Sequence, residues 1–469
     1  MKPSHHDISA SQCAAILLFT SWLFLVSDNC KADDWPRWMG PKVDGVWRET
    51  GMIDAFPESG PNILWRQEIG SGYAGPSVVG DQLFIMDRTE DENVGIKVEN
   101  DFKKAGQIAG GERVCCRNVK TGEVAWSHQY DCPYEIAYPT GPRCTPTVDG
   151  DFVYTLGAMG RLICLKKDSG DVVWEKELTK EYETKPPVWG YASHPLVDGE
   201  KLLVPVGGKG TAVVAFNKMT GEEIWRAVTT LDICYAPLVM FEPKDANGER
   251  QLIFWHADGV TSLNPDSGEE HWYFKFPEER NASQTAIATP TFIGRQLLIC
   301  EYYKGSMLLE IGSNPPSVVE KWQQFKINPK LDDAMNCMLA TPVVKEGYAY
   351  GIAYNGRGQG VLRCTDLQSG AMKWTKEDWI GEKPLMFSSG FITPNEDKYF
   401  IFDDIGELII GKLSPDGLEV LDRAKLLEPT SAARGRDVVW SHPAYADGKM
   451  YVRNDREIIC VDLKKPGQP

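Results

Sequence analysis

The sequence lacks the short motifs by which many enzymes can be identified. It contains no CxxCH for haem attachment, no phosphate-binding P-loop, no HExxH zinc motif and no GxSxG nucleophile elbow. Histidine is scarce, with 7 in 469 residues, and His256 and His271 lie inside repeated strand-forming segments. We therefore assign no catalytic residue and no metal ligand from the sequence.

Positive charge is also in deficit. Lys and Arg together number 50 against 66 Asp and Glu, which gives a net charge of −16 at pH 7. A protein that follows a nucleic-acid backbone needs a surplus of cationic side chains. We therefore expect no nucleic-acid partner.

Long apolar runs are missing beyond the N-terminus. An apolar stretch from about Cys13 to Val26 follows the basic Lys2 and is too short to cross a bilayer comfortably. With Ala32 as the small residue at the cleavage point, it predicts a signal peptide over residues 1–32 and a periplasmic or secreted protein. An uncleaved anchor is the alternative, and no membrane span is expected after cleavage.

What the sequence does contain is an internal repeat. A Gly–x3–Trp signal closes a polar turn at Trp126, Trp174, Trp225, Trp272 and Trp374, with weaker copies at Trp322 and Leu421 and an early one at Trp65. From Trp126 onward the successive intervals run from 47 to 52 residues. Self-similarity at such a period is typical of a repeat architecture.

A second signal marks the start of each repeat. Short β-rich runs begin near Pro76, Pro146, Pro195, Pro237, Pro290, Pro342, Gly390 and Pro443. Each is followed by two further apolar runs before the Trp strand, and four strands per period make one propeller blade. The fold class is therefore all-β, an eight-bladed β-propeller. The segment around Trp65 precedes every first strand and is expected to complete the last blade.

These repeats resemble a known family. TGEVAW-type signals at this period are similar to the pyrroloquinoline-quinone (PQQ) repeats of quinoprotein dehydrogenases and of the outer-membrane assembly factor BamB, and DWPRWMGPKVDGVW resembles a leader found before such propellers. The resemblance implies a leader over residues 33–61 and a propeller over 62–469. It specifies the fold better than the chemistry, because the repeat Trp is a packing residue.

Ten cysteines follow the predicted signal peptide. Cys116, Cys164 and Cys364 occupy equivalent third-strand positions and are expected to be buried thiols. This repetition argues against a vicinal Cys115–Cys116 disulfide of the kind found beside the quinone in family dehydrogenases. Cys132 and Cys144 bracket one loop at a blade junction, and we predict a disulfide between them in an oxidising compartment.

The candidate binding site is the ring of first-strand starts, which line the central channel of a propeller. The residues before the prolines are polar or small at most positions, and two blades carry Ser-His-Pro with aromatic residues nearby. The predicted ligand-binding funnel comprises Arg143, Thr145, Trp189, Tyr191, His194, Thr289, Thr341, Trp440 and His442. The alternative is a water-filled channel whose polar groups are bonded to backbone and water.

Two function hypotheses remain open. The first is a non-catalytic binding or scaffold propeller, a monomer without a cofactor, whose channel mouth takes a protein partner or an anionic or polyhydroxylated small ligand. The second is a PQQ-dependent quinoprotein oxidoreductase for an alcohol or sugar, with calcium beside the quinone. Acidic and amide residues are abundant, but none falls in a motif for that ion, whose oxygen ligands converge from separate segments that a sequence alone does not bring together.

Overall fold

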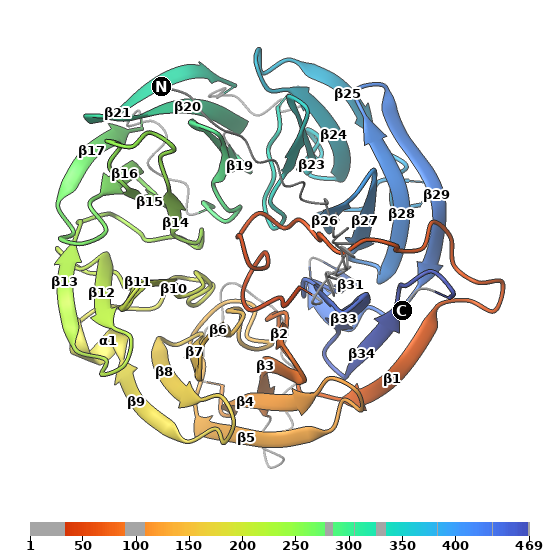
Figure 1. Ribbon diagram of the computed structural model, residues 1–469, viewed down its shortest axis with the longest axis horizontal. Coiled ribbons are helices and arrows are strands. Elements are labelled where there is room, and N and C mark those ends of the chain that lie inside the picture. Colours follow the sequence, from red (N-terminus) through yellow and green to blue (C-terminus); the bar gives the residue numbers. More distant parts are fainter. Residues whose placement is uncertain are drawn as a thin grey trace, which may run out of the picture. The chain divides into compact units, whose positions relative to one another are not determined.

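The computed structural model describes residues 33–89, 108–276, 285–303, 305–324, 334–381, 383–433 and 435–467. The predicted signal peptide, residues 1–32, lies outside them. The described residues from Asp33 onward belong to one compact unit. They form eight four-stranded antiparallel sheets, a two-stranded hairpin and a single short helix, and Figure 1 shows the sheets as the blades of a ring. The eight-bladed propeller predicted from the repeats is confirmed.

Each of the first four blades is a consecutive run of strands from the inside of the ring outward. Blade one comprises β2 (Ser77–Val79), β3 (Gln82–Thr89), β4 (Gly111–Asn118) and β5 (Val124–Asp131), and blade two β6 (Thr147–Asp149), β7 (Phe152–Leu156), β8 (Arg161–Lys166) and β9 (Val172–Glu177). Blade three comprises β10 (Leu196–Asp198), β11 (Lys201–Pro205), β12 (Val213–Asn217) and β13 (Glu223–Ala227), and blade four β14 (Val239–Phe241), β15 (Gln251–His256), β16 (Gly259–Leu263) and β17 (Glu270–Lys275). The helix α1 (Leu178–Glu181) follows β9.

The next three blades repeat this order. Blade five comprises β18 (Thr291–Ile293), β19 (Gln296–Glu301), β20 (Gly305–Ser313) and β21 (Pro316–Gln323), and blade six β22 (Val343–Lys345), β23 (Tyr348–Tyr354), β24 (Gly360–Asp366) and β25 (Met372–Lys376). Blade seven comprises β26 (Gly390–Asn395), β27 (Lys398–Asp403), β28 (Glu407–Ser414) and β29 (Gly417–Lys425), after which the hairpin β30 (Ser431–Ala433) and β31 (Arg436–Val438) leads to blade eight.

The ring closes between the two ends of the propeller. Blade eight contains β32 (Ala444–Ala446), β33 (Lys449–Arg453) and β34 (Glu457–Asp462), and its outer strand is the N-terminal β1 (Asn62–Glu68). Trp65 of β1 lies opposite Cys460 of β34 in an antiparallel register. The predicted closure is therefore confirmed. It pairs strands nearly four hundred residues apart and leaves the ring without an open end.

The repeat Trp residues connect neighbouring blades. The indole N–H of Trp126 donates to the carbonyl of Lys167 in the next blade at 2.9 Å, and that of Trp174 donates to Lys218 at the same distance. The turn glycine of the next blade lies against each ring, and Gly170 with φ +74° leaves no room for a Cβ beside Trp126. The Gly–x3–Trp signal thus marks both partners of a blade-to-blade contact.

The small third-strand residues make space for these rings. Cys116 lies opposite Trp126, Cys164 opposite Trp174 and Ala215 opposite Trp225 in the antiparallel registers. Of the five predicted Trp residues, Trp174, Trp225 and Trp272 are buried, whereas Trp126 and Trp374 are half-buried. The predicted positions between blades are confirmed, with partial exposure at two of them.

The leader, drawn in red in Figure 1, crosses the middle of the ring and contains a run of turns over residues 37–44. Trp35 exchanges two backbone hydrogen bonds with Val78 of β2, and the carbonyl of Pro36 accepts one from Val148 of β6. Farther along, the backbone N–H of Trp47 donates to Pro394 of blade seven. The leader therefore belongs to the folded core and sets the depth of the channel. Among the described residues, no helix has the length and apolar character needed to cross a bilayer.

Candidate functional site

Trp38 of the leader occupies the channel between the first strands. Its indole ring stacks on His194, with centroids 4.7 Å apart and an interplanar angle of 12°, and meets His442 edge-on at 4.4 Å. Its N–H donates to Thr289 Oγ1 at 2.8 Å. The polar ring of first-strand starts thus already holds an aromatic side chain, and that side chain comes from this protein.

Thr145 joins the two histidines across blades. Its backbone N–H donates to His194 Nδ1 at 2.9 Å, and its hydroxyl lies 2.6 Å from His442 Nε2. His442 Nδ1 lies 3.1 Å from the carbonyl of Pro443, so this nitrogen carries the proton and Nε2 accepts from the hydroxyl. By the same logic His194 must carry its proton on Nε2.

Both imidazoles are held neutral at physiological pH. Burial lowers the pKa of His442 to about 4. Burial also lowers the pKa of His194 well below its ordinary value, and the neighbouring His442 lowers it further. The floor of the site therefore offers hydrogen-bonding rings and no positive charge.

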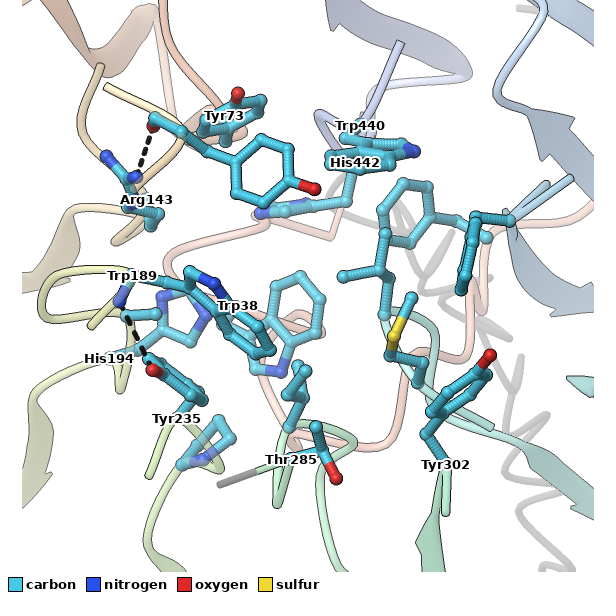
Figure 2. Close-up of a pocket in the computed structure, with 18 of the residues that line it drawn as sticks. Trp38, Tyr73, Arg143, Trp189, His194, Tyr235, Thr285, Tyr302, Trp440 and His442 are labelled. Carbon is cyan, nitrogen blue, oxygen red and sulfur yellow. Dashed lines mark hydrogen bonds between the residues drawn. The ribbon is translucent and has the colours of Figure 1, made fainter. Parts of the chain in front are cut away.

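Above this floor lies an aromatic cup of about 190 Å³, which Figure 2 shows in close-up. Its described lining comes from the leader, from loops that precede the first strands of several blades, from the turn between β19 and β20, and from the start of β26. The lining residues are Trp38, Tyr73, Tyr138, Arg143, Trp189, Ala192, His194, Tyr235, Pro237, Thr285, Ile287, Tyr302, Tyr303, Met338, Leu339, Phe387, Phe391, Trp440 and His442. Two of its walls are ring clusters, with Trp189 stacked on Tyr235 at 4.9 Å and Trp440 6.1 Å from Tyr73.

Arg143 is the one permanently cationic side chain in the described lining of the cup. Its guanidinium donates to the backbone carbonyls of Gly141, Tyr138 and Ala137, the last at 3.0 Å, and lies 5.2 Å from the centre of the Tyr73 ring. Within the described part of the chain it forms no ion pair with a carboxylate. Arg143 therefore both fixes the loop before blade two and leaves a positive charge at the wall of the cup.

Carboxylate and amide side chains are missing from the described lining of the cup. Nor do three or more His, Cys, Asp or Glu gather in a metal-binding arrangement anywhere in the part of the chain that the structure describes. Calcium takes six to eight oxygen ligands, mostly from such carboxylates and amides. The residues present in the cup do not fit a calcium-held quinone.

A second cavity, of about 430 Å³, lies on the other side of the leader turn. Arg37 and Met39 line it together with residues of β10, β14 and β18, whereas Trp38 between them lines the cup. The leader thus separates the cup from the second cavity, and its Trp38 closes the bottom of the cup.

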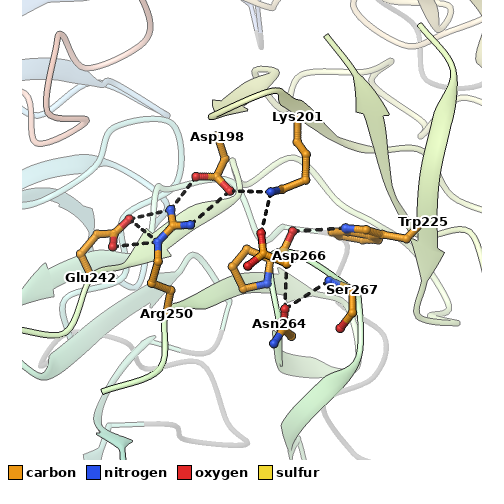
Figure 3. Close-up of polar contacts among 9 residues, drawn as sticks. Asp198, Lys201, Trp225, Glu242, Arg250, Asn264, Asp266 and Ser267 are labelled. Carbon is orange, nitrogen blue, oxygen red and sulfur yellow. Dashed lines mark hydrogen bonds and ion pairs between the residues drawn. The ribbon is translucent and has the colours of Figure 1, made fainter. Parts of the chain in front are cut away.

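Figure 3 shows a network of charged side chains near this second cavity. Arg250 bridges Asp198 and Glu242, the latter at 2.8 Å, and Lys201 lies 2.7 Å from Asp266. Burial raises the pKa of Asp198, but its bonds to Arg250 and Lys201 outweigh this and hold the pKa below its ordinary value. This network links blades three and four.

The nine predicted funnel residues fall into three groups. Arg143, Trp189, His194, Trp440 and His442 line the cup together. Thr145, Thr289 and Thr341 lie buried beneath it, where they bond His442, Trp38 and the backbone of Thr289 respectively. Tyr191 instead faces the core of blades two and three, and its hydroxyl donates to the carbonyl of Val206 at 2.7 Å.

Sequence reasoning missed most of the aromatic wall. Tyr73 and Tyr235 stand three and two residues before the first-strand prolines Pro76 and Pro237, as Trp440 stands three before Pro443. Comparing that position among repeats could have found them. No sequence signal placed Trp38 in the channel.

The predicted Cys132–Cys144 disulfide is wrong for this structure. Both residues are free, buried thiols, as are all ten cysteines of the described residues, Cys115 and Cys116 included. Cys132 packs in a core cluster between blades one and two, whereas Cys144 Sγ faces the carbonyls of Tyr191 and Ser193 at 3.7 and 3.5 Å. The loop between them therefore turns the two side chains into different cores, where burial raises the pKa of each thiol.

Comparison with known proteins supports the repeat assignment. A family model described as outer membrane protein assembly factor BamB matches residues 110–376. The chain is similar to that factor from Yersinia pestis, with 22% identity over 50% of this chain and 56% of the relative, and to that from Shewanella oneidensis, with 20% identity over 54% and 61%. It thus spans little more than half the length of these curated relatives.

Solved structures show the same fold at lower identity. The crystal structure of BamB from Moraxella catarrhalis superposes with a TM-score of 0.51 and 15% identity, over 86% of this chain and all of that one. The quinohemoprotein alcohol dehydrogenase from Comamonas testosteroni superposes with a TM-score of 0.58 and 14% identity, over 93% and 81%. At these identities the likeness extends to the propeller and not to its chemistry.

Proposed function

Because a family model covers more than half of it, this chain belongs to the family of the outer membrane protein assembly factor BamB, and we propose that it is a non-catalytic binding propeller of the cell envelope. It would act in the periplasm or as a secreted protein, as a monomer that presents the aromatic cup to a polypeptide partner. The observation that carries this proposal is the cup itself. It has a floor, aromatic walls and no carboxylate or amide in its described lining.

The competing hypothesis is a quinoprotein oxidoreductase, which shares the fold. That function needs PQQ held beside a hard cation by several oxygen ligands. The described cup supplies tyrosine hydroxyls, one guanidinium and two neutral imidazoles, and the two imidazoles are engaged with Thr145. We therefore propose that no PQQ or calcium is bound there.

Reconstitution separates the two hypotheses. Purified protein incubated with PQQ and calcium is expected to show neither a stoichiometric quinone absorbance after gel filtration nor dye-linked oxidation of alcohols or sugars. A calcium-dependent quinone spectrum accompanied by turnover would replace the binding function with the enzymatic one.

Photo-crosslinking tests the partner directly. Leu231 is 72% exposed in the loop that also carries Tyr235 of the cup, whereas Val319 is 60% exposed on the outer strand β21. Benzoylphenylalanine at position 231 should give a discrete polypeptide adduct in cells that naturally make the protein. The same group at position 319 is the matched control. Equal labelling from both sites, or none from position 231, would contradict a partner at this face.

A further inference from the structure

The polar atoms of the cup are mostly turned away from the cavity. The hydroxyl of Tyr73 donates to Thr140 at 2.9 Å, and that of Tyr235 accepts from the backbone N–H of Trp189 at 3.2 Å. The indole N–H of Trp440 points to Asp404 at 3.4 Å. What these side chains present to a ligand is therefore the carbon faces of their rings, a surface that favours an apolar group over a sugar.

The indole N–H of Trp189 is buried without a partner in the described part of the chain. Two other polar features of the lining suit contact with a ligand. The Nε2–H of His194 has no partner among the described residues, because Thr145 occupies the other ring nitrogen. The guanidinium of Arg143 donates to backbone carbonyls and forms no ion pair with a carboxylate of the described residues. Both features suit an acceptor, and the uncompensated charge favours an anionic one.

The size of the cup limits what can enter. Its volume of about 190 Å³ is below the roughly 300–1,000 Å³ of pockets that enclose drug-sized ligands. One aromatic ring system is the largest apolar group that such a space accommodates. Trp38 shows that the channel accepts such a ring, since a turn of the leader places its indole against His194 and His442.

The rim extends the apolar surface beyond the cup. Val188, Leu231, Tyr303 and Met386 are between 43% and 72% exposed. Tyr303 itself lines the cup, and Val188 and Met386 directly precede the lining residues Trp189 and Phe387. A free small molecule would leave this rim uncovered, whereas a polypeptide lying across the mouth would bury it.

We propose that the cup binds one aromatic side chain of an extended polypeptide segment, and that an acidic residue beside it pairs with Arg143. This inference rests on the proposed function, since it names the chemistry of the partner at the same site. The aromatic ring stacks between the Trp189 and Trp440 walls, and the flanking chain lies on the rim.

Peptide binding tests the chemistry. The probe is a fluorescein-labelled peptide with both ends capped, Gly-Ser-Gly-Asp-Trp-Gly-Ser-Gly, measured by fluorescence anisotropy on the whole protein. Replacing its Trp by Ala or its Asp by Asn is expected to weaken binding, by about tenfold or more for the ring, which corresponds to about 1.4 kcal/mol. Equal affinity of the Trp and Ala peptides would overturn the proposal.

Two kinds of protein variant locate the binding. Ala192→Trp is chosen to fill the cup from one of its lining positions, and Ile287→Phe is a second filling variant should the first fail to fold. Both should abolish peptide binding. Leu231→Ser and Met386→Ser on the rim should weaken the peptide several-fold and leave binding of free N-acetyl-tryptophan unchanged.

The outcomes are distinct. Binding that survives both filling variants, or N-acetyl-tryptophan binding as tightly as the peptide, overturns the inference. Crosslinking from position 231 without any peptide binding also overturns it, while the partner-binding function stands. PQQ-dependent turnover would remove the function itself.

Discussion

Gly170→Ala should destabilise the propeller by more than its backbone conformation explains. Gly170 adopts φ +74°, and a Cβ built on it would lie 2.5 Å from Cε3 of Trp126 in the preceding blade. A left-handed conformation costs a non-glycine residue roughly 1–2 kcal/mol, and overpacking a tight contact adds about 1–3 kcal/mol. We therefore expect a total loss of about 2–5 kcal/mol in the free energy of unfolding.

A matched control lies in the same blade. Gly150 adopts φ +57°, and a Cβ there would meet nothing within 4 Å. Gly150→Ala should cost only the conformational part, roughly 1–2 kcal/mol. Urea unfolding of both variants measures the difference. Combining Gly170→Ala with Trp126→Leu should recover part of the loss, because the smaller side chain removes the clash. Equal losses for the two glycines would refute the blade-to-blade role of the repeat signal.

Two further predictions concern buried titratable groups. Trp38→Ala should let water reach the channel histidines and raise the pKa of His442 from about 4 toward 6.5, while Trp38→Phe should leave this pKa low. Histidine NMR titration measures the pKa. An unchanged pKa in the alanine variant would contradict the role of Trp38 in excluding water from the channel. In the wild type the depressed histidine pKa values should make stability fall as pH drops from about 6.5 to 4, and Trp38→Ala should flatten that fall. Burial raises the pKa of Asp403 to about 8. The folded state therefore keeps a proton that the unfolded state loses near pH 4. The free energy of unfolding should consequently fall as pH rises between about 4 and 8, by at most about 1.4 kcal/mol per pH unit. Asp403→Asn can still accept the N–H bonds of Ile405 and Glu407. Measured by urea unfolding between about pH 4 and 8, its free energy of unfolding should lack this dependence on pH. If the free energies of wild type and variant changed with pH in parallel, Asp403 would be ionised in the folded protein.

The site was partly predictable because propeller geometry is periodic. Residues that precede each first strand are expected to face the channel, and this predicts that Arg143, His194 and His442 lie near one another, as they do in the cup. Tyr191 lies only three residues before His194, yet it faces the core. Short loops rotate successive side chains through large angles, and sequence spacing does not determine that rotation.

The sequence by itself determined the number of blades, their order and the closure of the ring. These features follow from a period that recurs along the chain. The Gly–x3–Trp turn and the first-strand signal each mark one strand or turn of a blade, and each blade packs against the blade formed by the next repeat. The burial of Cys116, Cys164 and Cys364 followed for the same reason, because each lies opposite a repeat Trp.

Only the tertiary structure decided which side chain fills the channel and whether Cys132 and Cys144 lie close enough to form a disulfide. Trp38 reaches His194, His442 and Thr289 from a leader that has no counterpart in the repeats, so no period could place it. Cys132 and Cys144 are close in sequence but pack in different cores, since a disulfide depends on where two side chains point. The aromatic cup likewise arises from loops of several blades that meet at one end of the ring, and such convergence is a property of three-dimensional packing.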